Sequence, residues 1–404
     1  MRRKRGVAAC GLFLAISLVG CGGGVTSTAA ADAGSTTNNS GSGTVGSAPG
    51  SSSGGCAALA ACCATLAGGS QSLCDSVAES GNSTNCAAEL SQLQAEDDCT
   101  GATVIASQVQ VPPNRLVSDG SMLFWTTTGA PGLLAMPIGG GAITILLAGS
   151  VGDYLAVDDV NVYVMEANDT AAGNDAGPPG LPLWNLTRIP KTGGRSTIVN
   201  ESGAYVMAAA TLGPTAYWLE SEVPVGSGWN LPLAVRSGGL RSGPTSLVAQ
   251  WMRSGNPPGE ISVTSSTVFL MEAGDSQGQQ QFFSLSTGPA GGFTSITGPT
   301  ACDFLAGDTA AVYCSQTTGS NFRIASDGTA TALGTAASSS YIVFDDTNAY
   351  WANMTTVGTI VKAPKAGGGS ATVIARDTNP TAIAIDANSV YWSDQDGYIK
   401  SIPK

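Results

Sequence analysis

The chain of 404 residues contains no histidine, and only 11% of its residues are charged. Without histidine there is no Ser-His-Asp triad, no histidine general base and no histidine metal ligand. Average soluble proteins carry roughly 25% charged residues, so Ser, Thr, Asn and Gly must cover most of this surface, as suits an exported protein. No apolar run approaches the roughly 20 residues that a membrane-spanning helix needs.

Residues 1–20 have the pattern of an export signal peptide. Basic residues at positions 2–5 precede an apolar stretch at positions 7–19, which is too short to cross a bilayer. The tetrad Leu18, Val19, Gly20 and Cys21 resembles the lipobox of bacterial lipoproteins. This resemblance implies cleavage before Cys21 and lipidation of its thiol, which anchors the protein to a membrane. The alternative is plain secretion with an unmodified Cys21.

The residue after Cys21 bears on the destination of such a lipoprotein. Gly22 stands where an Asp is associated with inner-membrane retention, so the resemblance implies the outer membrane or the cell surface. Removing the signal peptide takes four basic residues from a chain of net charge −12, which leaves −16. This acidic balance argues against nucleic acid as a partner.

Two short regions follow the signal peptide. Residues 21–55 are almost entirely Gly, Ser, Thr, Ala and Asn, so they cannot bury enough apolar surface to fold, and we expect a flexible tether. Residues 56–100 have few large apolar side chains, and a core this small needs disulfides in an exported protein. Their cysteines are Cys56, Cys62, Cys63, Cys74, Cys86 and Cys99.

The sequence does not choose among the pairings of these cysteines. Zinc is the weaker alternative, because the segment has neither a CxxC pair nor a histidine. Ala-, Leu- and Gln-rich segments at 57–66, 71–79 and 86–95 predict two or three short helices. The segment resembles small Cys-rich modules of myxobacterial lipoproteins.

Residues 101–404 repeat one pattern seven times at a spacing of about 40 residues: an apolar run, a turn residue, then an aromatic that opens a second apolar run. Repeats of short strands at this spacing are typical of propeller blades. We therefore predict an all-β, seven-bladed β-propeller, preceded by a small disulfide-rich α module. The marker aromatics are Phe124, Tyr163, Tyr217, Phe269, Tyr313, Tyr350 and Tyr391.

Two features predict how the blades are built and how the ring closes. Five repeats carry an Asp five residues before the marker aromatic, where its side chain can close the turn between the two inner strands. The last repeat ends one strand short, and residues 102–106 are identical to residues 371–375, which form the fourth strand of the preceding repeat. We expect this N-terminal strand to complete the last blade, leaving no unpaired sheet edge. The five Asp residues are Asp119, Asp158, Asp308, Asp345 and Asp386.

A proline followed by paired glycines marks the turn before the fourth strand in four repeats, and glycine supplies the positive φ that tight hairpins need. The prolines are Pro137, Pro190, Pro289 and Pro364. With these turns the region resembles YWTD-type and related bacterial propellers, most closely at residues 391–394, Tyr-Trp-Ser-Asp. The resemblance implies the propeller fold, although YWTD propellers have six blades.

The innermost strands predict one candidate site. Their first residues converge on one mouth of the channel, and polar side chains there could hold a polar ligand, since Arg binds carboxylates in a bidentate fork and Tyr offers a ring face and a hydroxyl. The alternative is that these side chains only fill the channel. The residues nine positions before the markers, with their neighbour Asp303, are Arg115, Tyr154, Ala208, Glu260, Phe304, Tyr341 and Ala382.

Four long loops are expected at the same mouth, at residues 167–182, 221–232, 250–258 and 273–281. They carry Trp229 and Trp251, and an exposed Trp beside carboxylates is a common way to bind a sugar. The alternative is that each Trp anchors its own loop. A weaker alternative is a calcium site formed by hard oxygen ligands on the first loop. Its ligands would be Asn168, Asp169, Asn174 and Asp175.

Two further interpretations concern catalysis and redox state. A glycosidase that pairs Glu260 with Asp303 or Glu166 stays open as an alternative, although the innermost strands carry no obvious acid pair. Cys302 and Cys314 fall at neighbouring positions of two strands, which predicts a disulfide. We therefore expect a lipid-anchored envelope protein whose propeller binds a glycan or an envelope protein. We predict no catalytic residue, no metal and no cofactor.

Overall fold

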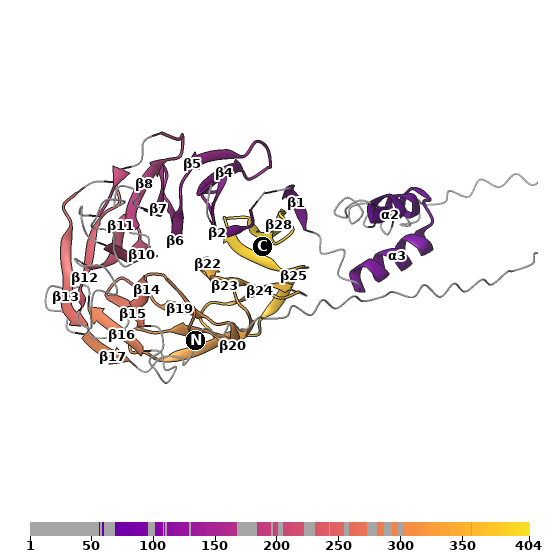
Figure 1. The fold of residues 1–404 in the computed structure, drawn as a ribbon. Coiled ribbons are helices and arrows are strands. Elements are labelled where there is room, and N and C mark those ends of the chain that lie inside the picture. Colours follow the sequence, from indigo (N-terminus) through magenta and orange to yellow (C-terminus); the bar gives the residue numbers. More distant parts are fainter. Residues whose placement is uncertain are drawn as a thin grey trace, which may run out of the picture. The chain divides into compact units, whose positions relative to one another are not determined.

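The computed structural model describes residues 56, 59, 69–95, 102–107, 109, 111–128, 131–167, 184–194, 197–200, 205–221, 231–241, 243–253, 258–272, 281–286, 293–296, 302–356 and 358–404. In these residues, seven four-stranded antiparallel sheets follow one another around a ring (Figure 1). This confirms the seven-bladed β-propeller. The colours of the ribbon pass around the ring in sequence order, so neighbouring repeats are neighbouring blades.

Blades 1 to 3 each run from an inner strand to an outer strand in chain order. Blade 1 contains β2 (Pro113–Ser118), β3 (Met122–Thr127), β4 (Leu133–Pro137) and β5 (Thr144–Leu147). Blade 2 contains β6 (Val151–Val157), β7 (Asn161–Ala167), β8 (Trp184–Pro190) and β9 (Thr197–Ile198). Blade 3 contains β10 (Tyr205–Leu212), β11 (Thr215–Ser221), β12 (Leu231–Gly239) and β13 (Ser246–Arg253).

Blades 4 to 6 follow the same order, and blade 7 takes its fourth strand from the start of the ring. Blade 4 contains β14 (Pro258–Val263), β15 (Thr267–Glu272), β16 (Gln281–Ser286) and β17 (Phe293–Ile296). Blade 5 contains β18 (Phe304–Gly307), β19 (Val312–Ser315), β20 (Thr318–Ile324) and β21 (Ala330–Ala337). Blade 6 contains β22 (Val343–Phe344), β23 (Asn348–Asn353), β24 (Gly358–Pro364) and β25 (Thr372–Asp377). Blade 7 contains β26 (Pro380–Ile385), β27 (Ser389–Asp394), β28 (Ile399–Pro403) and β1 (Thr103–Ala106).

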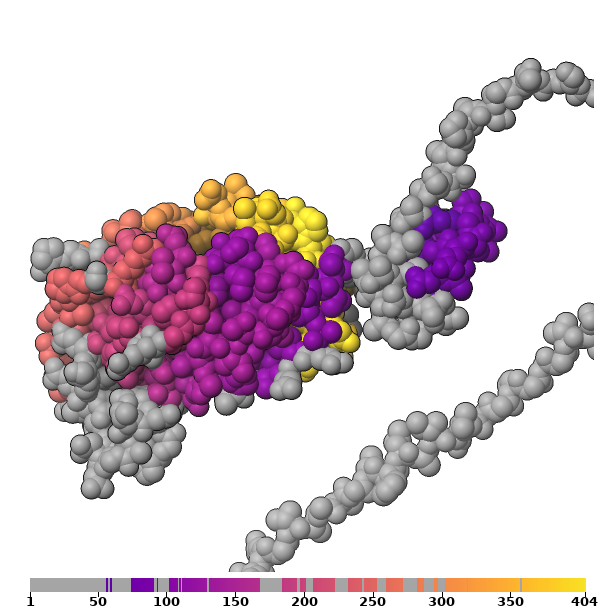
Figure 2. All heavy atoms as spheres, turned by 90° about the horizontal axis from the view of Figure 1, so that it is seen from above, coloured from indigo at the N-terminus to yellow at the C-terminus, as the bar shows by residue number. Residues whose placement is uncertain are grey.

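Ring closure occurs as predicted. Strand β1 pairs antiparallel with β28, and Thr103 lies opposite Ser401. Figure 2 shows the same closure on the surface, where indigo residues from the start of the propeller meet yellow residues from its end. The two chain ends of the propeller are therefore held in one sheet, and β1 covers the outer edge of β28.

The hydrophobic core of the propeller lies between the blades. Each of seven buried clusters joins side chains from two adjacent blades, so every junction in the described part of the ring has its own core. The tryptophans that follow four marker aromatics are fully buried in these clusters. The repeated aromatic and apolar pattern therefore encodes the packing of one blade on the next. These tryptophans are Trp125, Trp218, Trp351 and Trp392.

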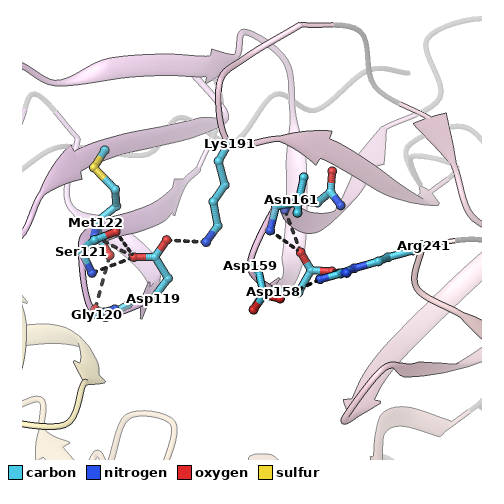
Figure 3. A network of polar contacts seen from close by, with 11 residues as sticks. Asp119, Gly120, Ser121, Met122, Asp158, Asp159, Asn161, Lys191 and Arg241 are labelled. Carbon is cyan, nitrogen blue, oxygen red and sulfur yellow. Dashed lines mark hydrogen bonds and ion pairs between the residues drawn. The ribbon is translucent and has the colours of Figure 1, made fainter.

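The predicted Asp turns are formed, and each Asp does more than close its own turn. In Asp119, Oδ1 accepts the backbone N–H groups of Ser121 and Met122, at 2.8 and 2.7 Å. Oδ2 forms an ion pair with Lys191, which belongs to the next blade (Figure 3). Asp158 likewise binds Arg241 of blade 3, with Nε to Oδ2 at 2.9 Å. We call this contact between one blade's turn Asp and the next blade's cation the inter-blade clasp.

The clasp recurs around the ring. Lys365 of blade 6 binds Asp308 of blade 5, with Nζ to Oδ2 at 2.9 Å. Lys404 of blade 7 binds Asp345 of blade 6 at 3.0 Å. The three lysines each follow the last proline of a third strand, as in Pro190–Lys191. In blade 1 the corresponding residue is Ile138, and no ion pair of Asp386 is found within the described ranges.

The Cys-rich region contains two described helices, α2 (Gly69–Glu79) and α3 (Ser83–Ala95), in agreement with the second and third predicted helices. The first predicted helix, at 57–66, lies mostly outside the described residues. Asn82 caps α3, because its Oδ1 accepts the backbone N–H groups of Thr84 and Asn85. Cys56 and Cys86 form a disulfide, with Cα atoms 4.9 Å apart. Zinc ligation by this pair is therefore excluded.

A second disulfide joins Cys302 and Cys314 in blade 5, as predicted, with Cα atoms 5.6 Å apart. Disulfides persist in oxidising compartments, so they indicate a periplasmic or extracellular protein. Among the residues that the structure describes, no helix has the length and apolar character needed to span a bilayer.

Candidate functional site

In five blades a backbone irregularity lies next to the predicted channel residue, near the start of the inner strand. The antiparallel pairing of the first two strands shifts register between Pro113 and Arg115 in blade 1, and between Pro258 and Glu260 in blade 4. Blades 2, 3 and 7 have a shift in the same part of the strand. A β-bulge increases local twist and redirects side chains. In these five blades the predicted channel residue therefore lies at a repeated bulge.

Arg115 is at the centre of this group. Its guanidinium lies over the ring of Tyr341 and 5.9 Å from the ring centroid of Phe304. The rings of Tyr341 and Phe304 are themselves stacked at a tilt, with centroids 3.8 Å apart. Blades 1, 5 and 6 thus meet across the axis through these side chains. Three of the seven residues nine positions before the marker aromatics therefore converge.

The Nε of Arg115 lacks a polar partner in this position. Its Nε is inaccessible to solvent and has no hydrogen-bond partner within the described ranges. Burial lowers the pKa of Arg115, and the nearby Tyr341 and Glu260 raise it again. A guanidinium stays protonated in proteins, so the site holds a positive charge that the described side chains leave without a direct ion pair.

Glu260 is the acidic counterpart from blade 4. Burial raises the pKa of Glu260 to about 7, and neither the charge of Arg115 nor the backbone N–H of Leu305 reverses that effect. The exposed carboxylate of Asp153 raises the pKa of Glu260 further. Near neutral pH, Glu260 therefore exists as a mixture of the protonated and ionised forms.

Two cavities adjoin Arg115 and Glu260. The first, of about 180 Å³, opens at the starts of the inner strands, and we call it the mouth cavity. The second, of about 310 Å³, follows the inner strands further along the channel, and its wall includes Leu155, Ile261 and Phe344. Arg115 and Glu260 line both cavities. A ligand in either one would contact the same charged pair.

Among the residues lining the mouth cavity that sequence reasoning did not select as site candidates are Asp153, Met165 and Trp184. Trp184 is the first residue of β8, and its half-buried ring forms part of the wall. Gly152 allows this packing, because a Cβ there would lie 3.1 Å from the Met165 methyl carbon and 3.5 Å from the Trp184 ring. Asp153 could have been found from its position next to Tyr154, whereas Trp184 carries no repeat signal.

Other predicted site residues lie elsewhere. Asp303 accepts the backbone N–H of Thr317 and is not among the residues lining either cavity. Trp251 was expected in a long loop, but this is wrong, since it lies in β13, opposite Leu233. There its ring packs against the core between blades 3 and 4. Strand β13 is the outermost strand of blade 3, at the rim of the ring in Figure 1.

Several predictions fall outside the described residues. These are the lipidation site Cys21, the loop residue Trp229 and the possible calcium ligands at positions 168, 169, 174 and 175. Within the described ranges, no group of three or more acidic or cysteine side chains is arranged to hold a metal ion. Glu166, the other proposed glycosidase partner, lies in β7 opposite Val151 and does not line the mouth cavity.

No protein-family model matches the chain, and no curated protein matches it either. Solved structures with similar folds include virginiamycin B lyase from Staphylococcus aureus, at 15% identity and a TM-score of 0.46 over 75% of this chain and 98% of that one. BamB from Moraxella catarrhalis matches at 15% identity and a TM-score of 0.39, over 71% of this chain and 83% of the other. The computationally designed Ika8 protein matches at 12% identity and a TM-score of 0.48, over 74% and 99%. At these values the similarities support no conclusion about function.

Proposed function

We propose that this protein is a lipid-anchored envelope protein whose β-propeller is a binding module, with the mouth cavity as its ligand site. The observation that carries the proposal is the unpaired guanidinium of Arg115 between two cavities. A side chain that only filled the channel would need no charge, and burying an unpaired charge is costly. The glycan ligand is favoured by Trp184, whose ring could stack on a sugar beside the carboxylate of Asp153.

The test is a binding screen of the full chain against glycans and peptidoglycan fragments. Trp184→Ala should abolish a binding signal that Trp251→Ala leaves intact, because only Trp184 lines the mouth cavity. Loss in Trp229→Ala alone would instead place recognition on the long loop that carries Trp229, and loss in Trp251→Ala alone would place it at the outer strand of blade 3. If no glycan binds, chemical cross-linking to envelope proteins tests the remaining form of the proposal. If no glycan binds and no envelope protein is cross-linked, the proposal that the propeller is a binding module is wrong.

The second candidate is a carbohydrate-active enzyme, and one observation favours it. A glycosidase needs two carboxyl groups in one site, one of them with a raised pKa, and the mouth cavity is lined by Asp153 and by Glu260, whose pKa burial raises to about 7. Hydrolysis of aryl glycosides that disappears in Glu260→Gln would establish the enzyme. Binding without turnover would support the proposal that the propeller is not catalytic.

A further inference from the structure

We propose that the mouth cavity binds a small molecule through its carboxylate, which lies against the guanidinium of Arg115, and that binding is accompanied by proton uptake at Glu260. The inference rests on the proposed function, because it names the ligand chemistry of the same site. For a glycan-binding module, the corresponding ligand is an acidic sugar.

Arg115 supplies the recognition element. A guanidinium carries five N–H donors in a planar fork, which matches the two oxygens of a carboxylate. In this site the guanidinium lies against the rings of Tyr341 and Phe304, and Nε is buried without an acceptor in the described structure, so the terminal Nη groups are the donors for a ligand in either cavity. No ion pair joins Arg115 to Glu260 among the described residues, so the Nη groups are not engaged by that carboxylate and remain available to a ligand.

Glu260 couples ligand binding to proton uptake. An anionic ligand beside Arg115 adds negative charge close to Glu260 and therefore favours its protonated form. Burial already holds the pKa of Glu260 at about 7, so only a small further shift is needed for proton uptake near neutral pH. The other ionisable groups around Glu260 are Arg115 on β2, Asp153 and Tyr154 on β6, and Tyr341 just before β22. Strands β10 and β18 add no ionisable lining residue, and their contributions to the two cavities are Met207, Ala208, Ala209, Ala210, Thr211, Leu305, Ala306 and Gly307.

The cavity walls fit a small ring with one acidic group. The mouth cavity, about 180 Å³, has Trp184 and Met165 on its wall, which can face the apolar side of a sugar ring. Asp153 is exposed and accepts a hydrogen bond from Asn114, so it can also accept hydroxyl groups. The second cavity offers no cationic side chain other than Arg115 among its lining residues. Arg115 is therefore the residue that makes the site prefer an acidic ligand to a neutral one.

The test is calorimetric titration of the full chain with glucuronate and with glucose, which differ by one carboxylate. Propionate and alanine are titrated as well, to distinguish a sugar acid from a simple acid or an amino acid. We expect glucuronate to bind about tenfold or more tightly than glucose, and Arg115→Met to remove that difference. The matched control is Lys362→Met, which removes another cation positioned over a ring, that of Tyr350, and should change nothing.

The pH dependence tests the role of Glu260. We expect the affinity of the acid to increase about fivefold from pH 8 to pH 6, and the Glu260→Gln variant to bind with the pH 6 affinity throughout. Equal binding of glucuronate and glucose, or an acid affinity that survives Arg115→Met, would overturn the inference while leaving a binding module in place. Binding that is independent of pH in the wild type would overturn the proton uptake. If none of the acids binds, the inference fails, and the glycan and cross-linking screens then decide the proposed function separately.

Discussion

At the residue scale, the propeller uses charged side chains in two opposite ways. Asp119 is fully engaged, with two backbone N–H groups on one oxygen and Lys191 on the other. Arg115 is held by aromatic rings alone, with no acceptor for Nε in the described structure. Charges of the first kind stabilise the ring, whereas a charge of the second kind is available for binding.

The first prediction concerns the inter-blade clasp. Lys191→Met leaves the half-buried Asp119 without its cation, and we expect the free energy of unfolding to fall by about 1 kcal/mol. Urea denaturation followed by fluorescence measures this change. Lys362→Met is the control, since Lys362 contacts a ring and no ion pair of it is found in the described part of the chain. An equal loss in both variants would show that the clasp contributes nothing specific.

The second prediction concerns acid. Burial opposes ionisation of Asp119, but Lys191 and the turn N–H groups outweigh it and lower its pKa to about 2. The pKa values of Asp158, Asp308, Asp345 and Asp386 are lowered as well. Since an unfolded Asp titrates at about 3.9, this stability is complete above about pH 4 and is lost as the pH falls towards 2. The urea concentration at the unfolding midpoint, measured from pH 6 to pH 2, should stay constant down to about pH 4 and decrease at lower pH. A midpoint that does not change with pH would contradict the clasp.

Sequence reasoning found one half of this clasp and missed the other. The spacing of Asp119 from Phe124 was enough to predict the turn, because both partners lie within one hairpin. Lys191 lies 72 residues from Asp119, so their contact depends on how blade 2 is placed beside blade 1. The repeated Pro–Lys pair was visible, but only the three-dimensional arrangement gives it a partner.

At the element scale, the predicted strands and closure are confirmed, and the error lies where a strand is longer than expected. The region around Trp251 was interpreted as part of a long loop at residues 250–258, between blades 3 and 4. Strand β12 extends from Leu231 to Gly239, and its pairing with β13 continues as far as Arg253. Backbone pairing with a neighbour therefore decided the structure of this segment, and a single sequence carries no direct signal of it.

The third prediction concerns blade 5, where strands β18 and β19 are short. The disulfide between Cys302 and Cys314 closes a sequence separation of 12 residues next to Phe304, which packs on Tyr341. A double replacement by alanine should lower the free energy of unfolding by about 2–3 kcal/mol. Thermal denaturation with and without a reductant measures the effect. A variant as stable as the oxidised wild type would show that packing alone holds the blade.

At the scale of the whole molecule, stability depends on the contact between the two ends of the propeller. Deleting residues 1–107 removes β1, its pairing with β28 and the buried Ala102. We expect a loss on the order of 3 kcal/mol and a less cooperative transition. The control deletes only residues 1–101 and keeps β1. Equal melting of the two truncated chains would mean that the ring does not depend on this closure.

The fifth prediction concerns the membrane anchor. If Cys21 carries lipid, Cys21→Ser should move the protein from the membrane fraction to the soluble fraction of cells that export it. Mass spectrometry of the mature N-terminus should show the added acyl chains in the wild type alone. A Cys21→Ser protein that stays with the membrane would contradict lipid anchoring at this residue.

The central claim is that the mouth of the channel is the binding site, and hydrogen exchange of the full chain with and without glucuronate tests it most directly. We predict slower amide exchange at the starts of β6 and β14, around Asp153 and Glu260, with the rim strand β13 unchanged. Protection confined to the rim, or absent at a concentration that saturates binding, would contradict the claim.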